Sequence, residues 1–434
     1  KQCTLARSES VVAMSQSEPV TQTAAVDRLA VRVTKDAARQ IRGGHPWVFN
    51  NSITSLKPGG KAGDLAVIFD ERREFMAIGL YDPDSAISIK ILHHGKPVQI
   101  DSSFWTQRLT AAQELRLGTF DPTHTTGYRC VHGENDSLPG LVLDRYANTY
   151  VLKLYSAAWF PHLEQILSSI AEVFDPTAVV LRLARGLQNP GQQFLFRGAA
   201  LRDGVALFGE LPEQAVAFIE NDLRFEADVI HGQKTGFFLD QRDNRARVRS
   251  LAQGSRVLDV YCCTGGFSVN AAAGAAALVH SVDISAAAID SAKRNMARNA
   301  GRAAVRACTH QVSVGDAMTV MSQMIEAGRL FDMVIVDPPS FASKQDQIDG
   351  ALRAYGKLTE LAVRLLNSGG MLVQASCSAR VTSEQFMESV GDAAYRSGVQ
   401  LDGISHTTHA IDHPDTFPQG AYLKAIFARV LPLR

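Results

Sequence analysis

The cysteines of this sequence follow no pattern, and that absence excludes two classes of protein. Six cysteines are scattered over 434 residues without a Cys-x-x-Cys pair or a regular spacing. A zinc ribbon needs paired cysteines, and a small disulfide-stapled secreted domain needs many at close intervals. The pattern favours a reducing compartment, so we expect a cytoplasmic protein with no metal.

Long hydrophobic runs and an excess of charge of either sign are missing as well. No stretch approaches the roughly 18 uninterrupted apolar residues that a membrane-spanning helix requires. Lys plus Arg and Asp plus Glu both total 44, so the formal net charge is zero. This balance does not indicate a nucleic-acid-binding protein, but it does not exclude one, because binding depends on a local basic patch.

The periodicity of the sequence divides the chain. Residues 1–26, rich in Ser, Thr, Gln and Ala, are predicted to be a disordered extension. Short alternating segments separated by turn-forming residues predict a small β-barrel over 27–97. A helix over 102–117, capped by Ser102, opens a mixed α/β region.

From about residue 245 strands and helices alternate, which predicts a mostly parallel sheet with helices on both faces. The expected strands are 256–260, 278–283, 311–314, 332–336, 371–376 and 423–430.

Acidic side chains stand at or near the ends of three of these strands. The first strand leads through Asp259 into a tight turn with paired glycines, Gly265 and Gly266, and then into a helix. Glycines let the backbone approach a ligand closely, and a helix N-terminus presents unpaired N–H groups. Asp283 ends the second strand, where an acid suits ribose hydroxyls, and Asp316 follows the third, within reach of an adenine amino group.

The class of ligand follows from what this turn lacks. Ligands bind at the carboxyl ends of the strands in an open α/β sheet. The turn is not Gly-x-Gly-x-x-Gly, and no cradle for a pyrophosphate is visible. A nucleoside without phosphates is therefore favoured over a nicotinamide dinucleotide.

The fourth and fifth predicted strands end in residues suited to chemistry on a flat base. The fourth runs into Asp337-Pro338-Pro339, whose prolines fix a rigid loop that can hold the carboxyl against the nitrogens of a nucleobase. The fifth ends at Cys377. A lone cysteine is more often a small buried apolar residue, but this position favours a nucleophile. A thiolate that adds to carbon 6 of a pyrimidine enables carbon 5 to accept a methyl group.

Several motifs occur in the order found in a known family. They are His45-Pro46-Trp47-Val48-Phe49, Gly133-Glu134-Asn135-Asp136-Ser137-Leu138-Pro139-Gly140, Leu143-Asp144-Arg145-Tyr146, the run His231–Arg245, Thr264-Gly265-Gly266-Phe267, Asp337-Pro338-Pro339-Ser340-Phe341, Ser376-Cys377-Ser378 and Asp412-His413-Pro414. On these motifs, residues 27–434 resemble the bacterial large-subunit ribosomal RNA cytosine-5 methyltransferases of the RlmI type.

The resemblance implies an α/β protein of three domains. It implies a PUA domain, a small RNA-binding barrel, over 27–97, a middle α/β domain over 98–215 and a class I methyltransferase domain with a Rossmann-like sheet over 216–434. It also implies S-adenosyl-L-methionine as the cofactor and ribosomal RNA of the large subunit as the partner. The residues expected at the cofactor are Lys234, Phe238, Asp240, Arg242, Asp259, Thr264, Gly265, Gly266, Phe267, Asp283, Ile284, Asp316, Asp337 and Pro338.

Particular roles follow for some of these residues. Lys234 or Arg242 is expected to pair with the methionine carboxylate of the cofactor, and Phe238 to pack on it. Cys377 and Asp337 are the expected catalytic residues. A base in folded RNA must be unpaired or flipped before it reaches them. The candidate RNA contacts are Pro338, Pro339, Phe341, Arg39 and Arg42.

The sequence leaves other functions open. Relatives of the same architecture that lack the cysteine methylate a guanine nitrogen, so an RNA guanine or adenine nitrogen methyltransferase is one alternative and a non-catalytic RNA-binding protein another. The loop at Asp337 lacks the second cysteine with which other RNA cytosine-5 enzymes release product. The nucleotide methylated, the choice between naked RNA and an assembled subunit, and the choice between monomer and homodimer also stay open.

Overall fold

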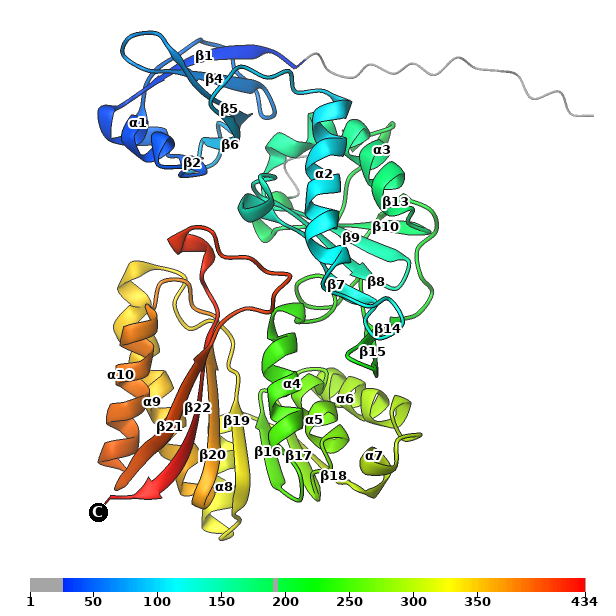
Figure 1. Ribbon diagram of the computed structural model, residues 1–434, viewed down its shortest axis with the longest axis vertical. Coiled ribbons are helices and arrows are strands. Elements are labelled where there is room, and N and C mark those ends of the chain that lie inside the picture. The colour runs from blue at the N-terminus through cyan, green and yellow to red at the C-terminus, as the bar shows by residue number, and fades with distance from the viewer. Residues whose placement is uncertain (1–25, 190–193, 434) are drawn as a thin grey trace, which may run out of the picture.

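The computed structural model describes residues 26–189 and 194–433, which form three bodies (Figure 1). The predicted disordered extension over 1–26 lies, except for Val26, outside the described residues. Within the described ranges, no helix is long and apolar enough to cross a membrane.

The N-terminal body is a six-stranded sheet in the order β2-β6-β5-β4-β1-β3. The strand at Trp47–Val48 is only two residues long, and a 3-10 turn over Asn50–Ser52 follows it. The Asn50 side chain accepts a hydrogen bond from the Asn51 backbone at 2.7 Å, and such local bonds compete with a strand ladder. The elements of the N-terminal body are β1 (Arg28–Val33), α1 (Lys35–Arg42), β2 (Trp47–Val48), β3 (Ile53–Leu56), β4 (Leu65–Phe69), β5 (Phe75–Tyr81) and β6 (Ile89–His94).

The middle body is a five-stranded sheet in the order β13-β10-β9-β8-β7, with two helices packed together. The helix expected over 102–117 is present, but its N-cap is Asp101 rather than Ser102, because the Asp101 carboxylate accepts from the Phe104 backbone at 3.0 Å. The elements are α2 (Ser102–Leu117), β7 (Gly127–His132), β8 (Leu141–Tyr146), β9 (Thr149–Leu154), α3 (Leu163–Phe174), β10 (Ala178–Leu183), and the short strands β11 (Leu195–Phe196), β12 (Ala199–Ala200) and β13 (Ala206–Phe208).

The middle sheet shares a core with the C-terminal body. Alternate strand residues face opposite sides of a sheet. Leu152 packs in the same cluster as α2 and α3, whereas Val151 and Val180 pack with Phe218 and Val257 of the C-terminal region. The hairpin β14 (Val216–Glu220) and β15 (Leu223–Ala227) contributes to this shared core.

The C-terminal body is a seven-stranded sheet in the order β18-β17-β16-β19-β20-β22-β21, in which β22 runs opposite to the other six strands. Its strands are β16 (Arg256–Val260), β17 (Leu278–Asp283), β18 (Thr309–Val314), β19 (Phe331–Val336), β20 (Leu366–Ser376), β21 (Val399–Thr407) and β22 (Lys424–Pro432). Its helices are α4 (Arg242–Leu251), α5 (Gly266–Ala273), α6 (Ala286–Arg298), α7 (Ala303–Ala307), α8 (Ala317–Glu326), α9 (Ile348–Arg364) and α10 (Ser383–Arg396).

The six expected strands are all present, and this confirms the predicted α/β sheet with its Rossmann-like alternation. The strand order reverses between β16 and β19, the place where open α/β sheets bind ligands. The sequence missed β21, an edge strand with polar residues and a register shift between Asp402 and Ser405.

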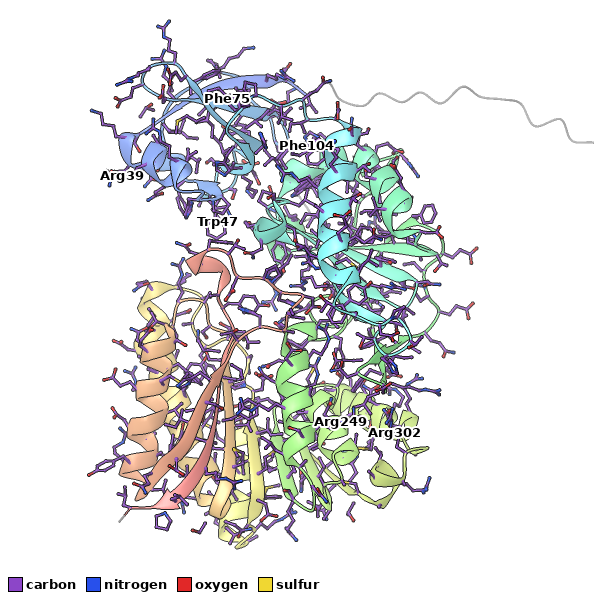
Figure 2. All side chains as sticks on the ribbon, viewed as in Figure 1. Arg39, Trp47, Phe75, Phe104, Arg249 and Arg302 are labelled. Carbon is purple, nitrogen blue, oxygen red and sulfur yellow. The ribbon has the colours of Figure 1, made fainter. Side chains whose placement is uncertain are left out.

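One long connection touches all three bodies. The β21–β22 loop (residues 408–423) rises from the C-terminal sheet toward the barrel (Figure 1). Its Phe417 ring meets the Trp47 ring edge-on at 5.2 Å between centroids, and Trp47 lies at the facing tip of the barrel (Figure 2). Its Thr416 backbone donates to Asn135 Oδ1 at 2.7 Å. The Tyr422 hydroxyl donates to Asp240 Oδ2 at 2.7 Å.

Candidate active site

A cleft opens where the carboxyl ends of β16, β17, β19 and β20 meet the segment before α4. Its empty volume, including the part open to solvent, is about 930 Å³. Most residues expected at the cofactor or the base line it: Lys234, Phe238, Asp240, Thr264, Gly266, Phe267, Asp283, Ile284, Asp337, Pro338, Pro339 and Cys377.

The glycine turn between β16 and α5 forms one wall through Gly266, whereas Gly265, also expected at the cofactor, does not line the cleft. Gly265 has a φ of +78°, and a Cβ atom on it would lie 2.8 Å from the Ala292 side chain. A Cβ on Gly266 would lie 2.9 Å from Arg245 Cδ. The Cys263 backbone donates to Asp283 Oδ2 at 2.9 Å, which ties this turn to the end of β17.

Asp259 supports the turn from beneath and does not line the cleft. Its carboxylate accepts from Ser268 Oγ at 2.6 Å and is fully buried. Burial raises its pKa to about 7, and the charge of Asp337 adds to that shift. Asp316 also lies outside the cleft lining and caps α8 by accepting from the Thr319 backbone at 3.0 Å.

The end of β17 offers a polar and an apolar surface side by side. Asp283 Oδ1 accepts from the Ser285 backbone at 2.9 Å, and Ser285 caps α6 as the sequence predicts. The neighbouring Ile284 side chain is 73 % exposed although it is fully apolar. An exposed apolar side chain in a concave site is suited to a flat ring.

The two serines that flank Cys377 turn it toward the cleft. Ser376 Oγ donates to the Tyr355 hydroxyl at 2.8 Å, and the Tyr355 hydroxyl bonds Ser378 Oγ at 2.9 Å. Ser378 Oγ also accepts from the Phe341 backbone at 3.1 Å, so it joins the Asp337 loop to the cysteine. Because both serines point inward and side chains alternate in extended backbone, Cys377 faces the opposite side.

Charges in the cleft act on the Cys377 thiol in opposite directions. Burial raises its pKa to about 11. The Lys234 ammonium lowers the pKa, and the carboxylates of Asp337 and Asp240 raise it. A nucleophilic thiolate at neutral pH therefore needs further positive charge.

Lys234 stands at the centre of a charged cluster. Its Nζ donates to Asp240 Oδ2 at 2.5 Å, the same oxygen that receives the Tyr422 hydroxyl, and lies 4.5 Å from the Phe238 ring centroid. Burial alone would raise the pKa of Asp240, but the Lys234 charge holds it far below its usual range. Asp240 Oδ1 is buried and has no hydrogen-bond partner among the described residues.

Burial raises the pKa of Asp337 to about 7, and nearby Asp240 adds to the shift. Between the unfolded value of about 3.9 and pH 7 the unfolded chain loses this proton while the folded chain keeps it, so stability falls as pH rises. Asp337→Asn is therefore expected to raise the free energy of unfolding at pH 8 by roughly 1 to 4 kcal/mol. Urea unfolding should show that this gain shrinks toward pH 5.

The exposed carboxylate of Asp36 is the matched control for this experiment. Asp36→Asn should change the free energy of unfolding at pH 8 by no more than about 0.5 kcal/mol. An Asp337→Asn gain of equal size at both pH values would contradict the assigned shift.

The structure corrects the assignment of Arg242 as a cofactor contact. Its side chain is 1 % exposed and does not line the cleft. Its two terminal nitrogens donate to the two carboxylate oxygens of Asp412 at 2.8 and 2.7 Å. The guanidinium joins α4 to the β21–β22 loop, and its remaining nitrogen, Nε, lies buried 3.9 Å from Glu220 Oε2 and not in the cleft.

Three expected RNA contacts lie outside the cleft. Phe341 packs its ring against Tyr355 at 5.1 Å between centroids. Arg39 and Arg42 lie on α1 in the barrel, where Figure 2 shows Arg39 on the outer side, and they pair with Asp36 and Asp70. Their contact with RNA stays a prediction.

Sequence reasoning missed several residues that line the cleft: Gln233, Phe237, Gln241, Arg245, Tyr261, Cys262, Cys263 and Leu423. All except Leu423 lie in stretches already singled out as motifs or as the cofactor turn. Leu423 follows Tyr422 in the β21–β22 loop, and no sequence pattern connects it with the cleft. Among the described residues, no group of three or more His, Cys, Asp or Glu side chains could hold a metal ion.

The cleft fits a nucleoside that carries an amino-acid tail. Asp283 and the exposed Ile284 offer a polar and an apolar surface for the nucleoside. The unpartnered Asp240 Oδ1 and the Lys234 ammonium offer an acceptor and a cation for the two ends of an amino acid. The cofactor suggested by the sequence therefore matches the donors and acceptors present.

Comparisons with known proteins agree with this geometry. Residues 196–429 match the family model described as S-adenosylmethionine-dependent methyltransferase, and residues 31–94 match a PUA-like domain. A putative methyltransferase from Streptococcus mutans shares the fold, with a TM-score of 0.75 at 18 % identity over 92 % of this chain and 99 % of that one. A putative methyltransferase complexed with SAH gives 0.76 at 18 % over 93 % and 100 %. The protein is an S-adenosylmethionine-dependent methyltransferase with a PUA-like domain at its N-terminal side.

Full-length relatives define the family more narrowly. A ribosomal RNA large subunit methyltransferase of Deinococcus radiodurans is 46 % identical over 407 residues, which cover 93 % of this chain and 98 % of the relative. Ribosomal RNA large subunit methyltransferase I of Tolumonas auensis is 34 % identical over 92 % of this chain and 99 % of its own. The chain belongs to this family of ribosomal RNA large subunit methyltransferases.

Proposed function

We propose that the protein methylates carbon 5 of a cytosine in large-subunit ribosomal RNA through a covalent adduct with Cys377. The observation that carries this proposal is the position of Cys377. The side chain lines the cofactor cleft, and its Sγ lies 4.0 Å from the Pro338 carbonyl oxygen of the loop that begins at Asp337. A nucleophile and a carboxyl in one cleft suit attack on a pyrimidine ring.

Different residues of the cleft would bind different parts of the cofactor. Asp283 and Ile284 would hold the nucleoside, Asp240 would accept from the ammonium group, and Lys234 would pair with the carboxylate. The bound cofactor supplies an electrophilic methyl group on a sulfonium. Phe238, over which Lys234 lies, would pack against the cofactor and exclude water.

The chemistry on the base follows from two side chains. The Cys377 thiolate forms a bond to carbon 6, and the electron pair of the ring double bond moves toward N3, where a protonated Asp337 donates its proton. A carboxyl with a pKa of about 7 is protonated in a large fraction of molecules near neutrality. Carbon 5 then accepts the methyl group. A base takes the proton from carbon 5, N3 returns its proton to Asp337, and the sulfur leaves with its electron pair.

The substrate class rests on the relatives. Both curated relatives named above are ribosomal RNA large subunit methyltransferases. A PUA-like domain joined to the cleft by Trp47 and the β21–β22 loop gives this chain a second surface for RNA. We therefore propose that the protein acts in the cytoplasm.

An exposed aromatic side chain beside the cleft is the clearest candidate for contact with RNA. Tyr155 follows β9, is 53 % exposed, and is held by its backbone donating to the Gly140 carbonyl at 2.9 Å. Lys153 Nζ lies 5.5 Å from the Tyr155 ring centroid and donates to the Lys234 carbonyl at 3.0 Å, so this ring adjoins the cleft. An exposed ring flanked by a cation is suited to stack on an unpaired base.

Tyr155→Ala is expected to weaken RNA binding by about 1 to 3 kcal/mol, the typical value of one base stacked on an aromatic ring. Tyr155→Phe should bind as the wild type does. Fluorescence anisotropy with a ribosomal RNA fragment at fixed salt measures this, and Tyr395→Ala on α10, whose ring is 68 % exposed, is the control. Equal affinity of Tyr155→Ala and the wild type would remove Tyr155 from the RNA surface.

The proposed reaction is tested by identifying its product. Ribosomal RNA treated with the protein and isotopically labelled S-adenosyl-L-methionine is digested to nucleosides and analysed by mass spectrometry. Labelled 5-methylcytidine is the expected product. A label on guanosine or adenosine would instead establish a nitrogen methyltransferase, with Cys377 in a structural role.

A further inference from the structure

The sequence motif over 143–146 lies on strand β8 of the middle body, outside the cofactor cleft. Two of its polar side chains, Asp144 and Tyr146, are fully buried. Both face the C-terminal body, because Tyr146 packs in the core that the two bodies share and side chains two residues apart lie on one face of a strand. A buried carboxylate and a buried phenol at such an interface require polar partners.

These partners belong to the segment that carries Lys234. The Thr235 hydroxyl donates to Asp144 Oδ2 at 2.6 Å, and the Phe237 backbone N–H donates to the Tyr146 hydroxyl at 3.2 Å. Thr235 is buried and does not line the cleft, whereas Lys234 and Phe237 do. The middle body therefore holds this segment from the side away from the cleft.

The hydrogen bonds of this network form a chain with one direction. Arg129 donates to both oxygens of Asp144, at 2.7 and 2.9 Å, so the carboxylate only accepts. Because Thr235 uses its proton on Asp144, Tyr146 donates to Thr235 Oγ1 at 3.0 Å rather than to the Phe237 carbonyl at 3.5 Å. The Tyr146 oxygen then accepts from the Phe237 N–H. Burial raises the pKa of Tyr146, so the hydroxyl keeps the proton that the chain requires.

The backbone of Lys234 needs support because its conformation is strained. Its φ is +54°, in the left-handed region that residues with a Cβ rarely adopt. Lys153 of β9 donates to the Lys234 carbonyl at 3.0 Å, and Arg182 of β10 donates to the Gly232 carbonyl at 3.0 Å. Lys153 and Arg182 are partners in register on neighbouring strands. Strained backbone persists only where the surrounding structure enforces it, and it is common at ligand-binding segments.

We propose that Asp144 and Tyr146 are positioning residues of the cofactor site, although they belong to the middle body. They act through Thr235 and fix the backbone from which the Lys234 side chain enters the cleft. The ammonium has three N–H donors and uses one on Asp240, so the backbone decides where the other two point. The proposal rests on the role proposed for Lys234 as the partner of the cofactor carboxylate.

The test measures cofactor binding without RNA. Calorimetry with S-adenosyl-L-methionine gives the dissociation constants of the wild type, Tyr146→Phe, Thr235→Val and Thr235→Ser. Phenylalanine and valine keep the size of the side chain and remove its hydroxyl. We expect each of them to weaken cofactor binding about tenfold, the typical effect of one lost hydrogen bond. Thr235→Ser keeps the hydroxyl and should bind as the wild type does.

Tyr150→Phe is the matched control. Tyr150 is a buried tyrosine of the same sheet, but its hydroxyl donates to the Phe174 carbonyl at 3.4 Å, within the middle body. Its removal should leave cofactor binding unchanged, and urea unfolding of both tyrosine variants measures any loss of stability. Equal losses of affinity in Tyr150→Phe and Tyr146→Phe overturn the proposal. The two Thr235 variants decide the question if Tyr146→Phe does not fold, and equal binding by both of them overturns it.

Kinetics separate positioning from a general defect of the enzyme. Acting through Lys234, the network contributes to cofactor binding, so Tyr146→Phe should raise the KM for S-adenosyl-L-methionine and leave kcat at saturation nearly unchanged. A lower kcat at an unchanged KM contradicts the positioning role.

Lys234→Met distinguishes this inference from the role on which it rests. If Lys234→Met weakens cofactor binding while Tyr146→Phe and Thr235→Val do not, the positioning role alone is wrong. If Lys234→Met binds as the wild type does, the role proposed for Lys234 fails, and this inference fails with it. Because the calorimetry uses no RNA, both results are separate from the identity of the methylated base.

Discussion

Replacing Cys377 by Ala is expected to abolish the covalent complex that forms between the protein and RNA carrying 5-fluorocytosine at the target position. In the proposed reaction the sulfur of Cys377 adds to carbon 6 and carbon 5 accepts the methyl group, but fluorine on carbon 5 leaves no proton to remove. The bond between sulfur and carbon 6 therefore persists, and a denaturing gel resolves the complex. Without the sulfur no bond forms, and methylation of normal RNA should fall by several orders of magnitude.

The cleft contains its own control for this experiment. Cys263 also lines the cleft, and its thiol pKa is raised to about 11, first by burial, as that of Cys377 is. It belongs to the glycine turn rather than to the loop beside Asp337. Cys263→Ala should keep the covalent complex, and both variants should bind S-adenosyl-L-methionine with wild-type affinity in calorimetry. A Cys377→Ala protein that methylates cytosine at the normal rate would refute the adduct.

Arg242→Met is expected to lower the free energy of unfolding by about 3 to 5 kcal/mol, because it leaves the buried Asp412 carboxylate without its counter-charge. Both side chains are at most 1 % exposed, and the pair is bidentate. Arg242 holds the pKa of Asp412 well below its usual range, opposing the effect of burial. In the variant the carboxyl should take up a proton as the pH falls, so the loss seen in urea unfolding should shrink at acidic pH.

An exposed pair provides the comparison. Arg39 and Asp36 contact at 2.6 Å on α1, but both side chains are largely exposed. Arg39→Met should change the free energy of unfolding by no more than about 0.5 kcal/mol. The double variant Arg242→Met/Asp412→Leu should recover part of the loss, since it removes the stranded charge. A loss in Arg242→Met as small as that in Arg39→Met would show that water or another cation satisfies Asp412.

The parts of the site that could be predicted from sequence are those in which one short segment carries the whole signal. The apolar run over 256–260 and the glycine turn after it define a strand, a ligand-binding turn and a helix without reference to the rest of the chain. Ser285 follows the same logic, because an N-cap contacts the backbone three residues later.

The parts that could not be predicted depend on partners that are distant in sequence. From the sequence alone, Arg242 is interpreted as a free cation near a cofactor. The fold shows that it instead pairs with Asp412, which lies 170 residues later. Lys424 reads as an exposed start to a strand, and only the packing of the turn after Cys377 shows that it is buried. Leu423 enters the cleft because the β21–β22 loop crosses the molecule, and nothing in its neighbouring residues encodes that path.

The β21–β22 loop also affects when the enzyme can form during synthesis. The backbone of Arg129 in β7 and the side chain of Arg116 in α2 both donate to Asp412, which follows them by 283 and 296 residues. Asp240 likewise receives the Tyr422 hydroxyl only after 182 further residues have been made. Contacts of such separation form late in folding. A growing chain lacks a finished cleft until nearly all of it has left the ribosome, so we expect an incomplete chain to be inactive as a methyltransferase.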